Sequence, residues 1–274
     1  MKNICFFSII FSLFFFSCGG GGETVKKIYD YERSDSLPTQ YSTHLGNIRV
    51  SIEEVNLLNS MFFKSGYQYN SGILNPPGKV SGYSNTKSEA INLGIYGSDL
   101  NYSLAFNQNQ EVLNCLNSIV ELAKKLGIEK AFDETLIKQL TESGDTISDK
   151  STILTKAYRH AQDQLHNEER AAIASLIVFG GWMEGLYIAT SNLKSKLGNA
   201  EINQKVFENL DTFYDVTEML KTFKDKNKNC EEILSEISGL FVIVENLINT
   251  RGNFSAENIE SLNKAIAELR NKLI

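Results

Sequence analysis

Two acidic residues, Asp99 and Glu184, stand inside long apolar stretches of the sequence. A tyrosine follows each of them after three residues, Tyr102 and Tyr187, and on a helix this spacing places both side chains on one face. A carboxylate on a buried face is costly unless it is paired or hydrogen-bonded. The favoured interpretation is structural: each carboxylate accepts a bond from a tyrosine or from an arginine such as Arg159, and fixes the helix register.

The alternative interpretation is a ligand pocket between two helices. Its acidic and aromatic walls would suit a small polar or cationic ligand. The predicted lining residues are Tyr96, Asp99, Tyr102, Trp182, Glu184 and Tyr187. Raised carboxyl pKa values in such a pocket could also support acid–base chemistry. Because no nucleophile or metal pattern accompanies these residues, binding is favoured over catalysis.

The histidines do not form a metal-binding pattern. His160 and His166 are six residues apart, whereas two ligands on one helix face need a spacing of three or four. His44 has no candidate ligand near it in the sequence. The chain also lacks a serine elbow, a phosphate-binding loop and a dinucleotide fingerprint. We therefore predict no catalytic residue, no metal and no cofactor.

Glycines interrupt both of the segments that carry the two acids, although each glycine costs a helix about 1 kcal/mol against alanine. They are Gly94 and Gly97 in the first segment, and Gly180, Gly181 and Gly185 in the second. Glycine permits close backbone approach, so we predict that the helix carrying Asp99 packs directly on the helix carrying Glu184. A leucine at Gly181 should then overpack this contact.

The same two segments raise the alternative of an internal repeat. Asp99 and Glu184 are 85 residues apart, as are Tyr102 and Tyr187. Each segment opens a run of about four predicted helices, so a duplicated four-helix unit would explain the spacing. Chance recurrence of short glycine–aromatic patterns is the competing explanation, because the flanking sequences align poorly.

The mature chain is predicted to be all-α, a single bundle of seven to nine helices over residues 46–274. Its three prolines all lie at or before residue 77, so later helices are not interrupted by proline. A loop is expected from Gly66 to Gly82, and apolar residues elsewhere recur with a period of 3.6. The predicted helices cover about 48–64, 86–106, 107–126, 129–142, 148–166, the apolar segment around 171–189, 200–224, 228–251 and 255–273.

The most apolar mature segment, residues 171–189, invites a transmembrane interpretation. Glu184 lies inside it and three glycines interrupt it, and charged residues are rare in membrane spans. A helix that is apolar on every side is also typical of the centre of a globular bundle. We therefore predict a central core helix.

The N-terminal residues indicate export and lipidation. Residues 1–17 carry one positive charge, at Lys2, before an apolar run that is too short to span a bilayer and is typical of a signal peptide. The run ends in Phe15-Phe16-Ser17-Cys18-Gly19, which resembles the bacterial lipobox, with Phe15 in place of the usual leucine. The resemblance implies cleavage before Cys18 and diacylglycerol on its thiol. Four glycines follow, so residues 18–45 are predicted to be a flexible tether.

The predicted address is the outer membrane, with the periplasmic or surface face left open. No aspartate follows Cys18, so inner-membrane retention is not signalled. Removing residues 1–17 takes away one of the 27 basic residues and none of the 33 acidic ones, which leaves a net charge of −7. This charge argues against nucleic acid as a partner. The expected partners are the membrane, through the anchor, and another envelope protein or a small ligand.

Two cysteines, Cys115 and Cys230, remain for the folded part of the mature chain. An oxidising periplasm would allow them to form a disulfide. Each one, however, falls in step with apolar neighbours at helical spacing, so the favoured prediction is two small buried hydrophobic residues.

Residues 93–102, residues 180–187 and the lipobox together resemble a group of uncharacterised, mainly helical lipoproteins of Bacteroidetes. The resemblance covers roughly Pro76 to Leu193. It implies the helical fold and the envelope address, and it implies no reaction, cofactor or catalytic residue. The expected function is a non-enzymatic structural or protein-interaction module of the cell envelope, and the alternative is a small-ligand binding protein.

Overall fold

The structure is a computed structural model, and it describes residues 57–142, 147–165, 168–250 and 254–274. The predicted signal peptide, Cys18, the tether and the predicted domain start near residue 46 lie outside the described residues. Residues 57–64 are helical and form the described part of the helix predicted over 48–64. The described residues belong to one compact unit.

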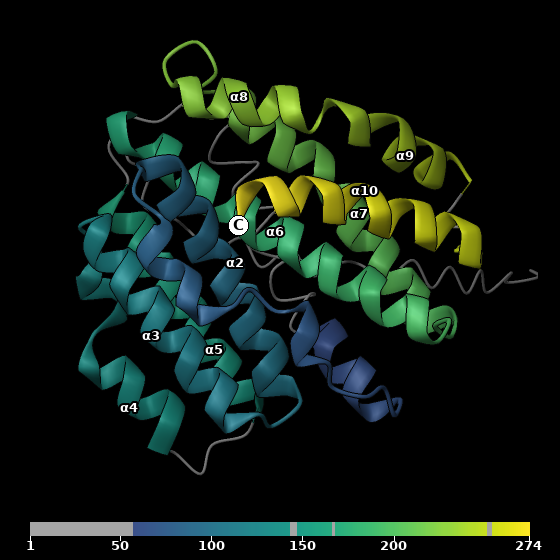
Figure 1. The fold of residues 1–274 in the computed structure, drawn as a ribbon, viewed down its shortest axis with the longest axis horizontal. Helices are drawn as coiled ribbons and strands as arrows, with labels where there is room; N and C mark the ends of the chain where they lie inside the picture. The colour runs from purple at the N-terminus through teal and green to yellow at the C-terminus, as the bar shows by residue number, and fades with distance from the viewer. Residues whose placement is uncertain (1–56, 143–146, 166–167, 251–253) are drawn as a thin grey trace, which may run out of the picture. The chain divides into compact units, whose positions relative to one another are not determined.

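All regular elements of the described residues are helices, as Figure 1 shows, and no strand occurs among them. The α-helices that follow residues 57–64 are α2 (Thr86–Ala105), α3 (Asn109–Lys125), α4 (Glu134–Glu142), α5 (Ile147–Gln164), α6 (Glu168–Ser195), α7 (Ala200–Lys221), α8 (Lys228–Glu236), α9 (Ser238–Asn249) and α10 (Ala256–Leu273). Three short 3-10 helices accompany them, η1 (Ser71–Ile73), η2 (Pro77–Gly82) and η3 (Glu129–Phe132). The predicted all-α class is confirmed.

The number of helices is higher than the predicted seven to nine. The segment predicted as one helix over 228–251 is two helices, α8 and α9, which meet at Ile237. Ser238 and Gly239 follow directly, and both are weaker helix formers than alanine or leucine. The expected loop from Gly66 to Gly82 also contains η1 and η2, which are too short to produce a visible periodicity.

Side-chain caps open several helices where the sequence has asparagine or serine. Asn85 accepts a hydrogen bond from the backbone N–H of Ser88 at the start of α2. Ser255 caps α10 in the same way, as predicted. These caps satisfy backbone donors that the first helical turn leaves without a partner.

Helix α6 is the central element of the described part of the chain. It packs against α2, α10 and α7, and Figure 1 shows α10 lying alongside it. Residues Arg170–Ser195 are long and apolar enough to cross a membrane by length and composition, yet 83% of their most apolar window is buried inside the protein. The predicted core helix is therefore present.

The core contains large aromatic side chains and both thiols. Tyr96, Tyr102 and Phe179 are fully buried. Cys115 and Cys230 are also buried, and both are free thiols. The structure therefore agrees with the favoured prediction for these cysteines and not with the disulfide alternative.

Candidate functional site

The two glycine-bearing helices, α2 and α6, pack backbone to backbone. A β-carbon built on Gly94 would overlap the carbonyl oxygen of Ile177, and one built on Gly180 would overlap the carbonyl oxygen of Ile91. The two overlaps are reciprocal: a glycine of each helix leaves room for a backbone carbonyl of the other helix. At Gly181 a β-carbon would lie 3.4 Å from the carbonyl oxygen of Gly94, an ordinary contact.

Two hydroxyl groups donate to backbone carbonyls of this helix pair. Ser98 Oγ on α2 donates to the carbonyl oxygen of Gly181 on α6 at 2.7 Å. Tyr158 Oη on α5 donates to the carbonyl oxygen of Leu93 at 2.9 Å, and its ring fills the space next to Gly97 that a side chain would otherwise take. Gly97 therefore makes room for Tyr158, whereas Gly94 and Gly180 make room for helix backbone.

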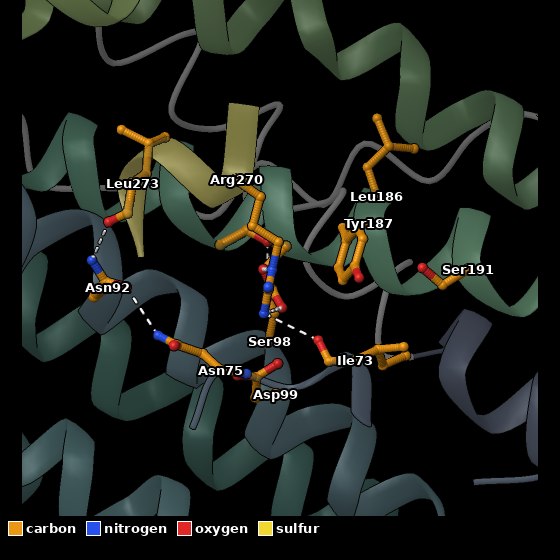
Figure 2. A network of polar contacts seen from close by, with 12 residues as sticks. Ile73, Asn75, Asn92, Ser98, Asp99, Leu186, Tyr187, Ser191, Arg270 and Leu273 are labelled. Carbon is orange, nitrogen blue, oxygen red and sulfur yellow. Dashed lines mark hydrogen bonds and ion pairs between the residues drawn. The ribbon is translucent and has the colours of Figure 1, made fainter. Parts of the chain in front are cut away.

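The close packing of α2 and α6 places Asp99 and Glu184 side by side. Both side chains are fully buried, and the charge of Glu184 raises the pKa of Asp99. Arg270 of α10 donates two hydrogen bonds to Glu184: Nε lies 2.5 Å from Oε2, and Nη2 lies 2.8 Å from Oε1. Figure 2 shows the Arg270 side chain extending from α10 toward Asp99. The partner is thus Arg270, and the sequence-based suggestion of Arg159 was wrong.

Asp99 has fewer partners than Glu184. The backbone N–H of Asn75 donates to Asp99 Oδ2 at 3.0 Å, whereas Oδ1 receives no hydrogen bond from a donor of the described residues. Burial raises the pKa of Asp99 well above its usual range, and the charge of Glu184 raises it further. Arg270 and the Asn75 N–H oppose this rise.

Glu184 is the better supported carboxylate of the two. Burial raises the pKa of Glu184, whereas the charge and hydrogen bonds of Arg270 lower it. The guanidinium stabilises the charged form of Glu184 directly, through its two hydrogen bonds.

Amide side chains extend the network to the chain end. Asn75 Nδ2 donates to Tyr83 Oη and to Asn92 Oδ1, each at 3.0 Å. Asn92 Nδ2 in turn donates to the carbonyl oxygens of Ser88, at 2.9 Å, and of Leu273, at 2.8 Å. The last turn of α10 is thereby bonded to α2, as Figure 2 shows for Asn92 and Leu273.

Two carbonyl groups of the segment before α2 also join the network. Arg270 Nη2 donates to the carbonyl oxygen of Ile73 at 3.1 Å, and Tyr96 Oη donates to that of Pro76 at 2.9 Å. These bonds satisfy polar groups that would be costly if they were buried alone. The site therefore ties α2, α6, α10 and the segment of η1 and η2 to one another.

Only some of the residues predicted for the site meet in it. Tyr96, Asp99, Glu184 and Tyr187 do, and the Tyr187 ring lies 4.5 Å from the guanidinium carbon of Arg270, a cation–π contact. Gly185 is buried on α6 beside Glu184.

Trp182 and Tyr102 face other neighbours. Trp182 Nε1 donates to the carbonyl oxygen of Asn209 at 3.2 Å, and its ring packs toward Phe213 on α7. Tyr102 stacks on Tyr69, with ring centroids 5.1 Å apart. A tyrosine three residues after an acid therefore does not have to line the same site as that acid.

Sequence reasoning missed Arg270, Asn75 and Asn92. A signal was present for Arg270, because it falls within the buried stripe of α10, whose apolar members are Ile259, Leu262, Ile266, Leu269 and Leu273. A buried arginine in such a stripe requires an acidic partner. Asn75 lies in the short segment between η1 and η2, where no helical periodicity marks a residue as buried.

The space next to the carboxyl pair is occupied by protein atoms. Arg270, Tyr187 and the Asn75 backbone surround the pair. The structure contains two surface hollows, and neither Asp99 nor Glu184 lines either of them. One hollow, of about 400 Å³, lies between residues 66–73 and the end of α6, and the other, of about 460 Å³, lies around η2 and the chain end.

No group of three side chains suited to hold a metal ion occurs in the described part of the chain. No protein-family model, curated protein or solved structure matches the chain. Function must therefore be inferred from the residues and their geometry.

Proposed function

We propose that the chain is a lipid-anchored, non-enzymatic module of the bacterial outer membrane that presents a rigid helical domain to another envelope protein. One observation carries the non-enzymatic part. The groups best suited to chemistry, Asp99 and Glu184, are fully buried, and they are bonded to Asn75 and Arg270 respectively. They bond helices together, which leaves recognition to the outer surface of the domain.

The lipid anchor rests on the lipobox-like sequence around Cys18. Cys18→Ala is expected to abolish incorporation of radiolabelled palmitate and to move the protein out of the membrane fraction, because the acyl chains on this cysteine supply about 0.8 kcal/mol of membrane affinity per buried methylene. Cys5→Ser is the matched control, since it changes a cysteine of the predicted signal peptide and should leave labelling intact. Label at the parental level in Cys18→Ala would contradict the anchor.

The interaction role is tested by cross-linking on intact cells. A photoreactive residue is introduced at one exposed apolar position in each variant. The positions are Val242 of α9, which is 72% exposed, Leu197 and Tyr214. We expect a discrete adduct with one envelope protein from at least one position, and its loss in the Cys18→Ala background. Absence of any adduct from a scan extended over the exposed helix faces would contradict the role.

The hollow at the end of α6 favours a second candidate function, the binding of a small hydroxyl-rich ligand with at most one negative charge. Its lining contains aromatic, amide and hydroxyl groups and one cation, and it contains no acid. The residues that supply these groups are Tyr67, Gln68, Tyr69, Asn70, Ser191, Asn192, Ser195 and Lys196. Its volume, about 400 Å³, lies within the range of ligand pockets.

A melting experiment tests this second candidate. Glucose, N-acetylglucosamine and glucuronate serve as probes, and a ligand that binds only the native state should raise the melting temperature as its concentration rises. Ser195→Trp should fill the hollow and remove the shift, whereas an exposed change such as Lys228→Gln should not. No shift with any of the three probes would eliminate this candidate.

We also propose that the chain belongs with the helical Bacteroidetes lipoproteins that it resembles, and that α2 and α6 arose by duplication. The reciprocal contacts support the duplication, because Gly94 with Ile177 and Gly180 with Ile91 exchange places under an offset of 86 residues. This offset differs by one residue from the spacing of the acids. An experimental structure in which the helices that follow α2 fail to superpose on those that follow α6 would contradict it.

A further inference from the structure

The buried site contains two carboxyl groups and one guanidinium. Asp99 and Glu184 are 0% exposed and Arg270 is 5% exposed. Among the described residues that contact the pair, Arg270 is the one cation. The other titratable groups that face it from the surrounding elements are neutral in their ordinary forms, namely Tyr83, Tyr96, Tyr187, Cys115 and Tyr158. With both carboxyls ionised, the site would hold an uncompensated negative charge away from water, which is strongly unfavourable.

The hydrogen bonds are distributed unevenly between the two carboxyls. Both donors that Arg270 directs at the pair go to Glu184, and its Nη2 also reaches Ile73. Asp99 receives one backbone N–H, on Oδ2, and nothing on Oδ1. The charge of Glu184 raises the pKa of Asp99, so the two carboxyls lie close enough to interact. A proton on Asp99 neutralises the site and gives Asp99 a donor that a nearby carboxylate can accept.

We propose that the native fold holds one proton between Asp99 and Glu184, carried by Asp99 and donated to Glu184, and that the chain releases this proton when it unfolds. The site then consists of a neutral acid, a carboxylate and a guanidinium, and it joins α2, α6 and α10 without a net buried charge. The stability of this junction is thereby linked to pH.

The direction of the linkage follows from the two states. Unfolding returns Asp99 to water, where its pKa is about 3.9, whereas burial holds the pKa of the folded Asp99 well above that range. The stabilisation is therefore complete below the unfolded pKa, and it is lost as pH rises toward the folded pKa. Within this window one bound proton changes the folding equilibrium constant about tenfold per pH unit, which corresponds to about 1.4 kcal/mol.

Asp99→Asn is the test variant, because the Asn side chain has the same shape. Its amide N–H can donate to Glu184, and it carries no titratable proton. Urea unfolding of the parent and the variant is compared from about pH 5 to pH 8, on the side of the window above the unfolded pKa. We expect the parental folding constant to fall by about tenfold per pH unit relative to that of Asp99→Asn. Asp211→Asn, the same change at an exposed position of α7, is the control and should follow the parent.

Infrared spectroscopy provides a readout that does not depend on stability. At neutral pH the parent and Asp211→Asn should both show the carbonyl band of a protonated carboxylic acid, and Asp99→Asn should lack it. Parallel pH profiles for all three proteins, or a parental spectrum without this band, would overturn the proposal. Neither outcome would affect the anchor or the surface interaction, which are tested separately.

Discussion

Replacing Gly94 or Gly180 by alanine is expected to destabilise the domain by about 3 kcal/mol, the upper end of typical overpacking effects. Alanine is the better helix former by about 1 kcal/mol, so the loss occurs against the local preference. At each position the added methyl would overlap a carbonyl oxygen of the opposing helix, Ile177 or Ile91. Backbone cannot rotate away as a side chain can, so α2 and α6 would have to separate.

Gly181→Ala is the matched control, because its β-carbon would meet the carbonyl oxygen of Gly94 at 3.4 Å and the Ser98 hydroxyl at 3.7 Å. We expect this variant to lie within about 1 kcal/mol of the parent, with the gain in helix propensity offsetting the tighter contact. Gly181→Leu should still overpack the contact, by about 1 to 3 kcal/mol. Urea denaturation ranks the variants. A Gly94→Ala protein as stable as Gly181→Ala would show that the helices are not in this close contact.

Removing one partner of the buried ion pair is expected to produce the second large effect. Arg270→Met should cost about 3 to 5 kcal/mol, because it leaves the Glu184 carboxylate buried without its cation. It also releases the carbonyl oxygen of Ile73, so residues before α2 should become more susceptible to proteolysis. Unfolding free energies and limited proteolysis measure the two consequences.

A double variant separates the ion pair from simple packing. Glu184→Leu combined with Arg270→Met removes both charges, and it should recover a large part of the stability lost in Arg270→Met alone, because no unpaired charge remains buried. Losses that simply add in the double variant would indicate that the two residues stabilise the fold independently. That result would contradict the ion-pair role of the site.

Several features could be predicted from the sequence because they depend on neighbours along one helix. The period of 3.6 and the lack of proline after Pro77 predict an all-helical chain. The apolar character of α6 predicts a core position, and the glycines in α2 and α6 predict that these helices pack together. Each of these signals is carried by residues within a few turns of one another.

The composition of the site depends on contacts between distant segments. Arg270 is 86 residues from Glu184, and Asn75 is 24 residues from Asp99. No local pattern selects these partners from the other arginines and asparagines, because the choice depends on how α10 and the segment before α2 lie across the helix pair. Residues three or four apart share a face of one helix, but that relation does not determine which face meets which neighbour.

The same distinction explains which glycines matter and where the aromatic residues point. The sequence predicted that all five glycines allow the helices to approach, with leucine at Gly181 as the overpacking change. The register of α6 against α2 places Gly94 and Gly180 on opposing backbone, whereas Gly181 has only an ordinary contact. The rotation of α6 likewise turns Trp182 toward α7 while Glu184, two residues later, faces α2 and α10. Helix formation is a local property that the sequence by itself determines, whereas register and rotation result from packing the whole core, so only the tertiary structure decides them.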